Sequence, residues 1–285
     1  RYYLLPLRGK SNLEYQSSLE AYWKRIREEF VPDVVHIHGT EAAHGVAYIR
    51  ACGSKGVVVS IQGSVSACAR YYLTGISRGE VLKNLTFRDI VKRDNLLQQQ
   101  RKFYKRGIIE QEYIRSVRHV IGRTSWDKAH VWAINPEAHY HFCNETLRGE
   151  FYKHSWRYED CEKHSIFVSQ AGYPIKGLHQ VLKAMPFVLR SYPDAKIYVA
   201  GDDITRRPWW RLTGYGAFLK SLVKRYSLEG RVCFTGPLNE REMCERYLKA
   251  NVFVCPSSIE NSPNSLGEAQ LLRLPCIASY VGGVP

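Results

Sequence analysis

Two carboxylates in the second half of the chain have the types and spacing to bind a hydroxyl-rich ligand. Seven residues separate Glu260 from Glu268. Carboxylates accept hydrogen bonds from hydroxyl groups. The stretch IENSPNSLGEA (259–269) predicts that Glu260 lies in a loop and Glu268 in the first turns of the following helix.

The start of that helix offers a means of binding an anion. Asn264, Ser265 and Leu266 are predicted to present unpaired backbone N–H groups, which attract phosphate at a helix N-terminus. Two carboxylates beside such a phosphate site suit a nucleotide attached to a sugar. The alternative is that Glu260 is a solvated loop residue and that Glu268 only stabilises the first helical turn.

The elements that must position these groups form an alternating pattern. Short apolar runs predict strands, and amphipathic stretches between them predict helices that begin near residues 178, 214, 239 and 264. The predicted strands lie at 164–170, 195–201, 231–236, 251–257 and 275–280. This alternation indicates an α/β fold with a doubly wound parallel sheet, whose ligands bind at the carboxyl ends of the strands. Pro186 predicts a kink or a split in the first of these helices.

The first half of the chain is less regular but also indicates a parallel α/β domain. Strands are predicted at 33–39, 57–63 and 119–124, with a long, basic and mostly helical insertion at about 65–117. We place the boundary in the charged stretch 157–164. The expected domains are therefore 1–160 and 161–285.

Composition excludes several classes of protein. Hydrophobic residues make up 45% of the 285 residues and the formal net charge is +14, so the chain is neither disordered nor fibrous. The eight cysteines include no C-x-x-C pair, which favours reduced cysteines and no zinc site. Asp202 and Asp203 are interpreted as a turn or helix cap rather than a metal pair. The absence of an initial Met and the abrupt end at VGGVP indicate a piece of a longer protein, cut at both ends.

The segment IENSPNSLGEAQLLRLPCIASYVGGVP (259–285) resembles the E-x7-E region of retaining glycosyltransferases of family 4, which have the GT-B architecture. The similarity includes both glutamates and the G-G-V-P loop. Lys176 and Gly177 match the K-G pair of the family's donor domain, and DVVHIHG (33–39) resembles a segment of its N-terminal domain. The resemblance implies two Rossmann-like domains facing a cleft, an N-terminal acceptor-binding domain and a donor-binding C-terminal domain that is incomplete here.

The resemblance also implies a role for each residue of the motif. Glu268 would accept hydrogen bonds from the ribose hydroxyls, and Glu260 would contact the transferred sugar. Lys176 would neutralise the departing diphosphate, together with the amides at Asn264 to Leu266. The implied enzyme moves a hexose-type sugar from a nucleoside diphosphate sugar to a hydroxyl acceptor with retention of configuration, and needs neither a metal nor another cofactor.

The sequence departs from the family pattern at two places. Many members carry an arginine shortly before K-G, whereas Ser169, Gln170 and Ala171 supply no cation, so Arg206 or Arg207 is a candidate substitute.

Many members also have His where this chain has Gln62. Gln62 and His38 are therefore the candidate residues for contact with the acceptor. His36 is interpreted as structural and is expected to face the opposite side of its strand from His38.

A basic stretch suggests a further partner. Residues 83–128 contain twelve Lys or Arg against five acidic residues, with aromatic residues between them. This favours contact with an anionic membrane surface near a sugar or lipid-linked acceptor, over nucleic acid or a merely solvated helix face. A cytoplasmic protein, peripheral on the inner face of the membrane, would then act in surface polysaccharide, lipopolysaccharide or glycolipid synthesis.

Two alternatives remain open. In one, the chain is a basic nucleic-acid or membrane-binding module that transfers no sugar. In the other, it is a GT-B nucleotide-sugar epimerase, which would turn over its donor without an acceptor.

Overall fold

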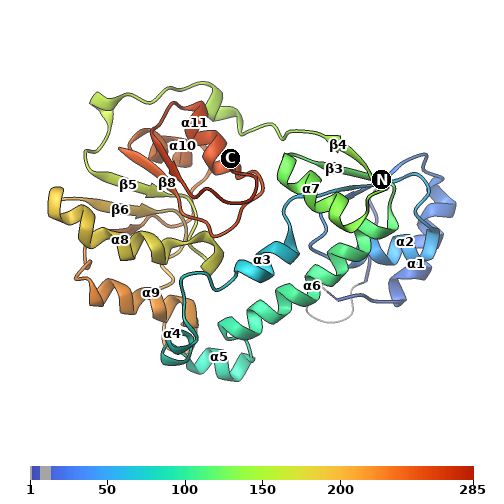
Figure 1. Cartoon of the computed structure of the whole chain (residues 1–285), viewed down its shortest axis with the longest axis horizontal. Coiled ribbons are helices and arrows are strands. Elements are labelled where there is room, and N and C mark those ends of the chain that lie inside the picture. Colours follow the sequence, from blue (N-terminus) through green and yellow to red (C-terminus); the bar gives the residue numbers. More distant parts are fainter. Residues whose placement is uncertain (1, 7–13) are drawn as a thin grey trace. The chain divides into compact units, whose positions relative to one another are not determined.

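A computed structural model describes residues 2–6 and 14–285 of the chain (Figure 1). These residues form two compact units, of which the first comprises the described residues up to 70 together with 101–145, and the second comprises 71–100 and 146–285. Within the described part of the chain, no helix is both long enough and apolar enough to span a membrane. None of the eight cysteines forms a disulfide bond.

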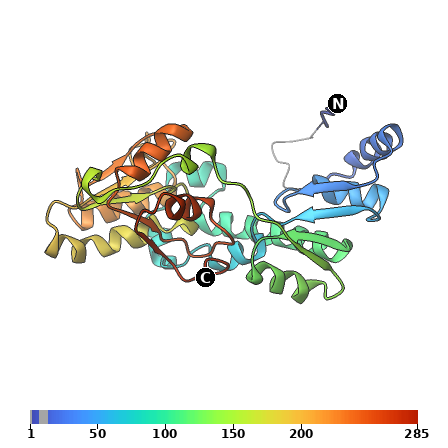
Figure 2. The same ribbon diagram turned by 90° about the horizontal axis from the view of Figure 1, so that it is seen from above.

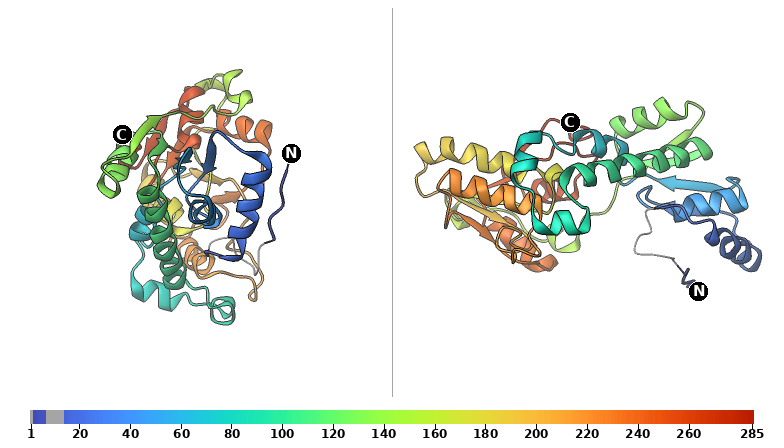
Figure 3. Two further views of the ribbon diagram at one scale, coloured as in Figure 1. Left: turned by 90° about the vertical axis from the view of Figure 1, so that its right-hand side faces the viewer. Right: turned by 90° about the horizontal axis from the view of Figure 1, so that it is seen from below.

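The first unit is built on a four-stranded parallel sheet. The strands, in the order β1-β2-β3-β4, are β1 (Val35–His38), β2 (Val57–Ser60), β3 (His119–Gly122) and β4 (His139–Phe142). Its helices are α1 (Ser18–Phe30), α2 (His44–Cys52), most of α3 (Val65–Tyr71), the greater part of α6 (Leu96–Ser116) and α7 (Ser125–Ile134). The 21-residue α6 is one continuous helix (Figure 3).

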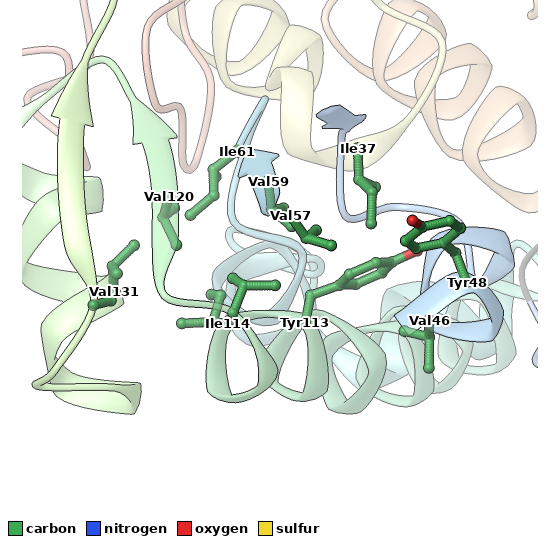
Figure 4. Close-up of a cluster of buried hydrophobic side chains, with 12 residues drawn as sticks. Ile37, Val46, Tyr48, Val57, Val59, Ile61, Tyr113, Ile114, Val120 and Val131 are labelled. Atoms are coloured by element: carbon green, nitrogen blue, oxygen red, sulfur yellow. The ribbon is translucent and has the colours of Figure 1, made fainter. Parts of the chain in front are cut away.

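The core of the first unit lies between one face of this sheet and the helices. Val57, Val59 and Val120 from neighbouring strands are at most 1% exposed and lie toward Tyr113 and Ile114 of α6 (Figure 4). The β-branched side chains favour strands and pack well on a pleated surface. Because the buried Tyr113 hydroxyl donates to the Ala42 carbonyl oxygen at 2.6 Å, this polar group is satisfied inside the core.

The second unit contains a five-stranded parallel sheet. In the order β7-β6-β5-β8-β9, its strands are β7 (Val232–Phe234), β6 (Lys196–Val199), β5 (Ser165–Val168), β8 (Val252–Cys255) and β9 (Cys276–Ala278). Its α-helices are α4 (Arg78–Lys83), α5 (Phe87–Lys92), α8 (Leu178–Ser191), α9 (Gly214–Arg225), α10 (Glu240–Leu248) and α11 (Asn264–Leu271). Three short 3₁₀ helices are η1 (Gly149–Tyr152), η2 (Tyr158–Asp160) and η3 (Pro174–Lys176).

The strand order of this second sheet reverses where β5 meets β8, which is the arrangement of a doubly wound fold. Consistent with this, α8 and α10 lie on opposite faces of the sheet (Figures 2 and 3). Ligands of such folds bind at the carboxyl ends of the strands beside the reversal. The first sheet follows the order of the chain without a reversal.

Residues 71–100 pack on the second unit, although the sequence predicts them as part of an N-terminal domain that ends at residue 160. The imidazole of His179 on α8 is fully buried and hydrogen bonds to the Thr74 carbonyl oxygen at 2.9 Å. Lys183 donates to the Gly75 carbonyl oxygen at 2.7 Å. These backbone contacts hold the stretch on α8. The second division between the units falls at residues 145 and 146, earlier than the predicted stretch 157–164.

The structure confirms every predicted strand and adds one α-helix and one strand to the predicted elements. α1 and β4 were not predicted; β4, HYHF, contains two histidines and no β-branched residue. α8 contains Pro186 but is one helix from Leu178 to Ser191, so the predicted split is absent.

Candidate functional site

The loop that follows β5 presents Lys176 at the carboxyl edge of the second sheet. Lys176 ends η3, and Gly177 then adopts a left-handed conformation with φ of 73°. A Cβ atom on Gly177 would lie 1.9 Å from the Pro256 carbonyl oxygen, so only glycine allows the loops after β5 and β8 to meet this closely. The Ser258 amide also donates to the Ile175 carbonyl oxygen at 2.8 Å, which links the same two loops.

Lys176 and Glu260 form an ion pair at this junction. The Lys176 Nζ lies 2.5 Å from Glu260 Oε1, and the two side chains are 18% and 14% exposed. Ser257 Oγ donates to the same carboxylate oxygen at 2.8 Å. Burial acts to lower the pKa of Lys176, but the Glu260 charge and hydrogen bond outweigh burial and hold this pKa above its ordinary value. The structure therefore brings together the predicted cation and the first predicted carboxylate.

The G-G-V-P loop after β9 fixes the backbone of Glu260. Gly282 has φ of 55°, and a Cβ atom there would lie 2.1 Å from the Glu260 carbonyl oxygen. The Gly283 amide donates to that same oxygen at 3.0 Å. Glu260 is thus held through its side chain by the loops after β5 and β8, and through its backbone by the loop after β9.

Glu268, the second predicted carboxylate, lies on α11 and is only 3% exposed. Both of its oxygens accept hydrogen bonds from Arg148, at 2.6 Å from Nε and 2.7 Å from Nη2. The hydrogen bonds to Glu268 raise the pKa of Arg148 further, so the guanidinium is fully charged. Arg148 also lies over the ring of the buried Phe151, 4.8 Å from its centroid. The sequence did not suggest Arg148, because it lies 120 residues before its partner and in no motif.

The N-terminus of α11 differs in part from its prediction. The Leu266 amide donates to the Pro263 carbonyl oxygen at 3.0 Å, as does the Gly267 amide at 3.3 Å. Leu266 therefore does not present an unpaired N–H group, because the first turn closes back on Pro263. No side chain caps the helix at Pro263, and the Ser265 carbonyl oxygen accepts from the Tyr247 hydroxyl at 3.0 Å. Asn264 and Ser265 remain at the helix start, where phosphate binding stays a prediction.

The acceptor-side candidates Gln62 and His38 belong to the first unit. Arg123 Nη2 donates to Gln62 Oε1 at 2.9 Å, and Arg123 in turn pairs with Glu145 at 3.0 Å. His38 is exposed at the end of β1. The expectation that His36 faces away from His38 is wrong, because residues two apart on a strand project to the same face. Their rings lie 5.3 Å apart.

The first unit also contains a buried carboxylate that sequence reasoning missed. Glu110 on α6 is fully buried and accepts hydrogen bonds from the Val65 amide at 2.7 Å and the Ser66 amide at 2.9 Å. Burial acts to raise the pKa of Glu110, but hydrogen bonds from His130, Ser66 and the amides hold it below its ordinary value. These contacts place an ionised carboxylate at the N-terminus of α3, which is a stabilising arrangement.

Arg206 and Arg207, the candidate substitutes for the missing phosphate-binding arginine, pair instead with Asp203 at 3.4 Å and Asp202 at 3.8 Å. Asp203 also accepts from the Thr205 amide at 2.9 Å, which supports its predicted role in a turn. In the described part of the chain, no group of three or more His, Cys, Asp or Glu residues is arranged to hold a metal ion.

Comparison with known proteins places this architecture in a family. Residues 150–285 match the family described as Glycosyl transferases group 1. The chain is 29% identical over 109 residues to the sulfoquinovosyl transferase of Arabidopsis thaliana, an alignment that covers 38% of the chain and 19% of that protein.

Two solved structures are similar to the whole chain. Sucrose-phosphate synthase from Thermosynechococcus elongatus has a TM-score of 0.66 at 16% identity, covering 94% of this chain and 60% of the synthase. WaaG, a glycosyltransferase involved in lipopolysaccharide biosynthesis, has a TM-score of 0.61 at 13% identity, covering 98% of this chain and 68% of WaaG. At these identities the similarity establishes the fold.

The chain spans less than two thirds of the length of the sulfoquinovosyl transferase and of the synthase. Its two parallel α/β sheets are those of a GT-B fold, and the loops described above lie within the matched segment. Residues 150–285, a little under half of the chain, match the glycosyl transferases group 1 family, which is glycosyltransferase family 4.

Proposed function

We propose that this chain transfers a hexose-type sugar, with retention of anomeric configuration, from a nucleoside diphosphate sugar to a hydroxyl acceptor. The observation that carries the proposal is the partly buried Lys176–Glu260 pair at the carboxyl ends of β5 and β8. The reaction needs a fixed cation beside a hydroxyl-binding carboxylate, and the pair supplies both. The match of residues 150–285 to the glycosyl transferases group 1 family supports the same assignment.

In the proposed reaction, the bond between the anomeric carbon and the diphosphate oxygen breaks, and its electron pair moves onto the diphosphate. The Lys176 ammonium stabilises that negative charge as it develops, which is the usual way in which a positioned charge lowers a barrier. The acceptor oxygen forms the new bond to the anomeric carbon, and its proton passes to the departing diphosphate. Glu260 would orient the sugar, and Glu268 would bind the ribose hydroxyls.

The donor site is tested by calorimetric and thermal-shift titration with UDP, GDP, ADP and dTDP, without added metal. We expect one nucleoside diphosphate to bind selectively and Glu268→Ala to weaken that binding about tenfold or more, since hydrogen bonds to charged groups contribute about 1.5–3 kcal/mol each. Absence of binding to any of the four by the folded wild-type protein would reject the donor site. Turnover of the donor without an acceptor would instead favour the epimerase.

We further propose that the acceptor is presented at an anionic membrane surface, as in the synthesis of a glycolipid, lipopolysaccharide or surface polysaccharide. Support comes from exposed aromatic rings on the second unit. Phe87 of α5 contacts Trp209, with ring centroids 5.0 Å apart, and Trp209 and Trp210 are 63% and 55% exposed. Exposed cations lie close to these rings in sequence. They are Lys92 and Arg93 at the end of α5, and Arg206 and Arg211 on either side of the two tryptophans. Tryptophan and arginine together suit the headgroup region of a bilayer.

The membrane proposal is checked by co-sedimentation with vesicles of phosphatidylcholine alone or with phosphatidylglycerol. Binding only to the anionic vesicles, lost in Trp209→Ser with Trp210→Ser, would support it. Equal binding to both vesicles, or none to either, would contradict it.

A further inference from the structure

The pairing of Glu268 with Arg148 bears directly on how a nucleoside reaches this site. The two hydrogen bonds, of 2.6 and 2.7 Å, run side by side from one guanidinium to the two oxygens of one carboxylate. The Glu268 side chain is 4% exposed, whereas that of Arg148 is 38% exposed. The carboxylate is therefore enclosed mainly by protein, and the guanidinium covers both of its oxygens from the more open side.

A ribose 2′,3′-diol would bind a carboxylate with the same geometry. It offers two neighbouring O–H donors, one for each oxygen, as the guanidinium offers two N–H donors. A carboxylate has about four lone-pair positions, but protein encloses this side chain, so the diol and the guanidinium compete for the more open side of both oxygens. The role of Glu268 in ribose binding is part of the function proposed above, and this inference rests on it.

We propose that Arg148 is a displaceable latch on the nucleoside site, which must release Glu268 before the ribose diol can bind. The backbone favours such a movement, because residues 146–148 precede η1 and belong to no helix or strand. Glu268 is not the sole partner of the guanidinium, which in the paired state also lies over the Phe151 ring and is stabilised by the charge of Glu240.

The latch makes nucleotide binding weaker than the contacts alone would give. A site that is open only a fraction of the time binds its ligand with an affinity reduced by that fraction. Removing the latch therefore strengthens binding, and it does so only for ligands that use the ribose hydroxyls. An arginine that merely stabilised the fold, or that itself contacted the nucleotide, would have no such effect.

The test is calorimetric titration of the full chain with the nucleoside diphosphate that binds best and with its 2′,3′-dideoxy analogue. The variants are Arg148→Met, which removes both donors, and Arg148→Lys, which keeps the charge but not the paired geometry. Arg246→Met is the matched control. Arg246 pairs with Glu162 at 3.0 Å and lies over the Tyr198 ring at 4.1 Å, and neither partner belongs to the site.

We expect Arg148→Met to bind the ribonucleotide about tenfold more tightly and Arg148→Lys about threefold more tightly, with the dideoxy analogue and Arg246→Met unchanged. Weaker binding, no change, or an equal gain for both ligands would overturn the latch. If Arg148→Met does not fold, as a melting curve would show, Arg148→Lys decides the question. If neither the wild type nor any variant binds a nucleotide, the proposed function is rejected. If the wild type binds but the variants bind no more tightly, only the latch is rejected.

Discussion

Glu260 is held at its carboxylate by Lys176 and Ser257 and at its carbonyl oxygen by the Gly283 amide. Such fixation matters because a charge that is already in position stabilises a transition state without reorganising. It also means that neither partner of the ion pair can be removed without leaving the charge of the other partly buried and without its counter-ion.

Replacing Lys176 with Met should therefore lower the turnover of the nucleotide sugar by about a hundredfold to a thousandfold, the range typical of a lost electrostatic group. Lys153→Met is the matched control, because Lys153 makes a 2.5 Å pair with Glu150 but is 63% exposed. Steady-state kinetics with both variants would check this. A similar loss of turnover in Lys176→Met and Lys153→Met would contradict a specific role for Lys176 in the site.

A second prediction at this scale concerns His179. Burial lowers the pKa of this imidazole from 6.5 to about 4 in the folded chain. Between pH 6.5 and 4 the unfolded state therefore binds more protons than the folded state, and stability falls as the pH falls. By about pH 4 the loss should approach 3 kcal/mol, at about 1.4 kcal/mol for each pKa unit.

Urea unfolding of wild type and His179→Gln at pH 7.5, 6 and 5 would measure this loss. The variant should be less stable at pH 7.5 but should lose less stability on acidification. The same pH dependence in both proteins would assign the effect to other groups.

Sequence reasoning placed some side chains of the candidate site and missed other buried polar contacts for a physical reason. Lys176 and Glu260 could be placed because each closely follows a strand, and the carboxyl ends of parallel strands meet at one edge. Arg148 and Glu110 could not, because each pairs with a segment distant in sequence and no local pattern encodes such a contact.

At the scale of elements, two glycines allow three loops to converge on Glu260. Gly177 and Gly282 both have positive φ and both approach a carbonyl oxygen. The sequence predicted the loops and their order, but not the close approach, which depends on atoms of other loops.

Gly177→Ala should lower the free energy of unfolding by more than the roughly 1–2 kcal/mol that a left-handed alanine costs alone, because its Cβ would also collide with the Pro256 carbonyl oxygen. Gly230→Ala is the control that measures the cost of the left-handed conformation without the collision. Gly230 has φ of 76° and no atom within 4 Å of an added Cβ. Urea unfolding of both variants would measure the difference, and equal losses would contradict the argument from close approach.

The elements that the sequence missed had weak local signals. β4 contains two histidines and pairs only with β3 at the end of the sheet, so burial does not impose an apolar pattern on it. The contact of residues 71–100 with α8 has no sequence signal for another reason. It depends on the backbone carbonyl oxygens of Thr74 and Gly75, and a residue of any type carries such an oxygen.

At the scale of the whole molecule, each unit has its own hydrophobic core. A ligand stabilises the part of a protein that binds it, by about 2.7 kcal/mol at a hundred times its Kd. We therefore expect a saturating nucleoside diphosphate to slow amide hydrogen exchange in β5, β8 and α11, and to leave β2 and β3 unchanged. Mass spectrometry of exchanged peptides would measure this, and equal protection of both cores would contradict it.

The interleaving of the two units has a consequence for biosynthesis. Residues 71–100 leave the ribosome before residues 101–145 complete the first unit, and before the helix on which they pack exists. Thr74 and Gly75 precede their partners His179 and Lys183 by 105 and 108 residues. At a synthesis rate of about 5–20 residues per second, this stretch waits about 5–20 s for its partners. During that time Tyr72, Ile76 and Val81, which are buried in the folded chain, are without the second unit, and the nascent chain is most exposed to aggregation and to capture by chaperones.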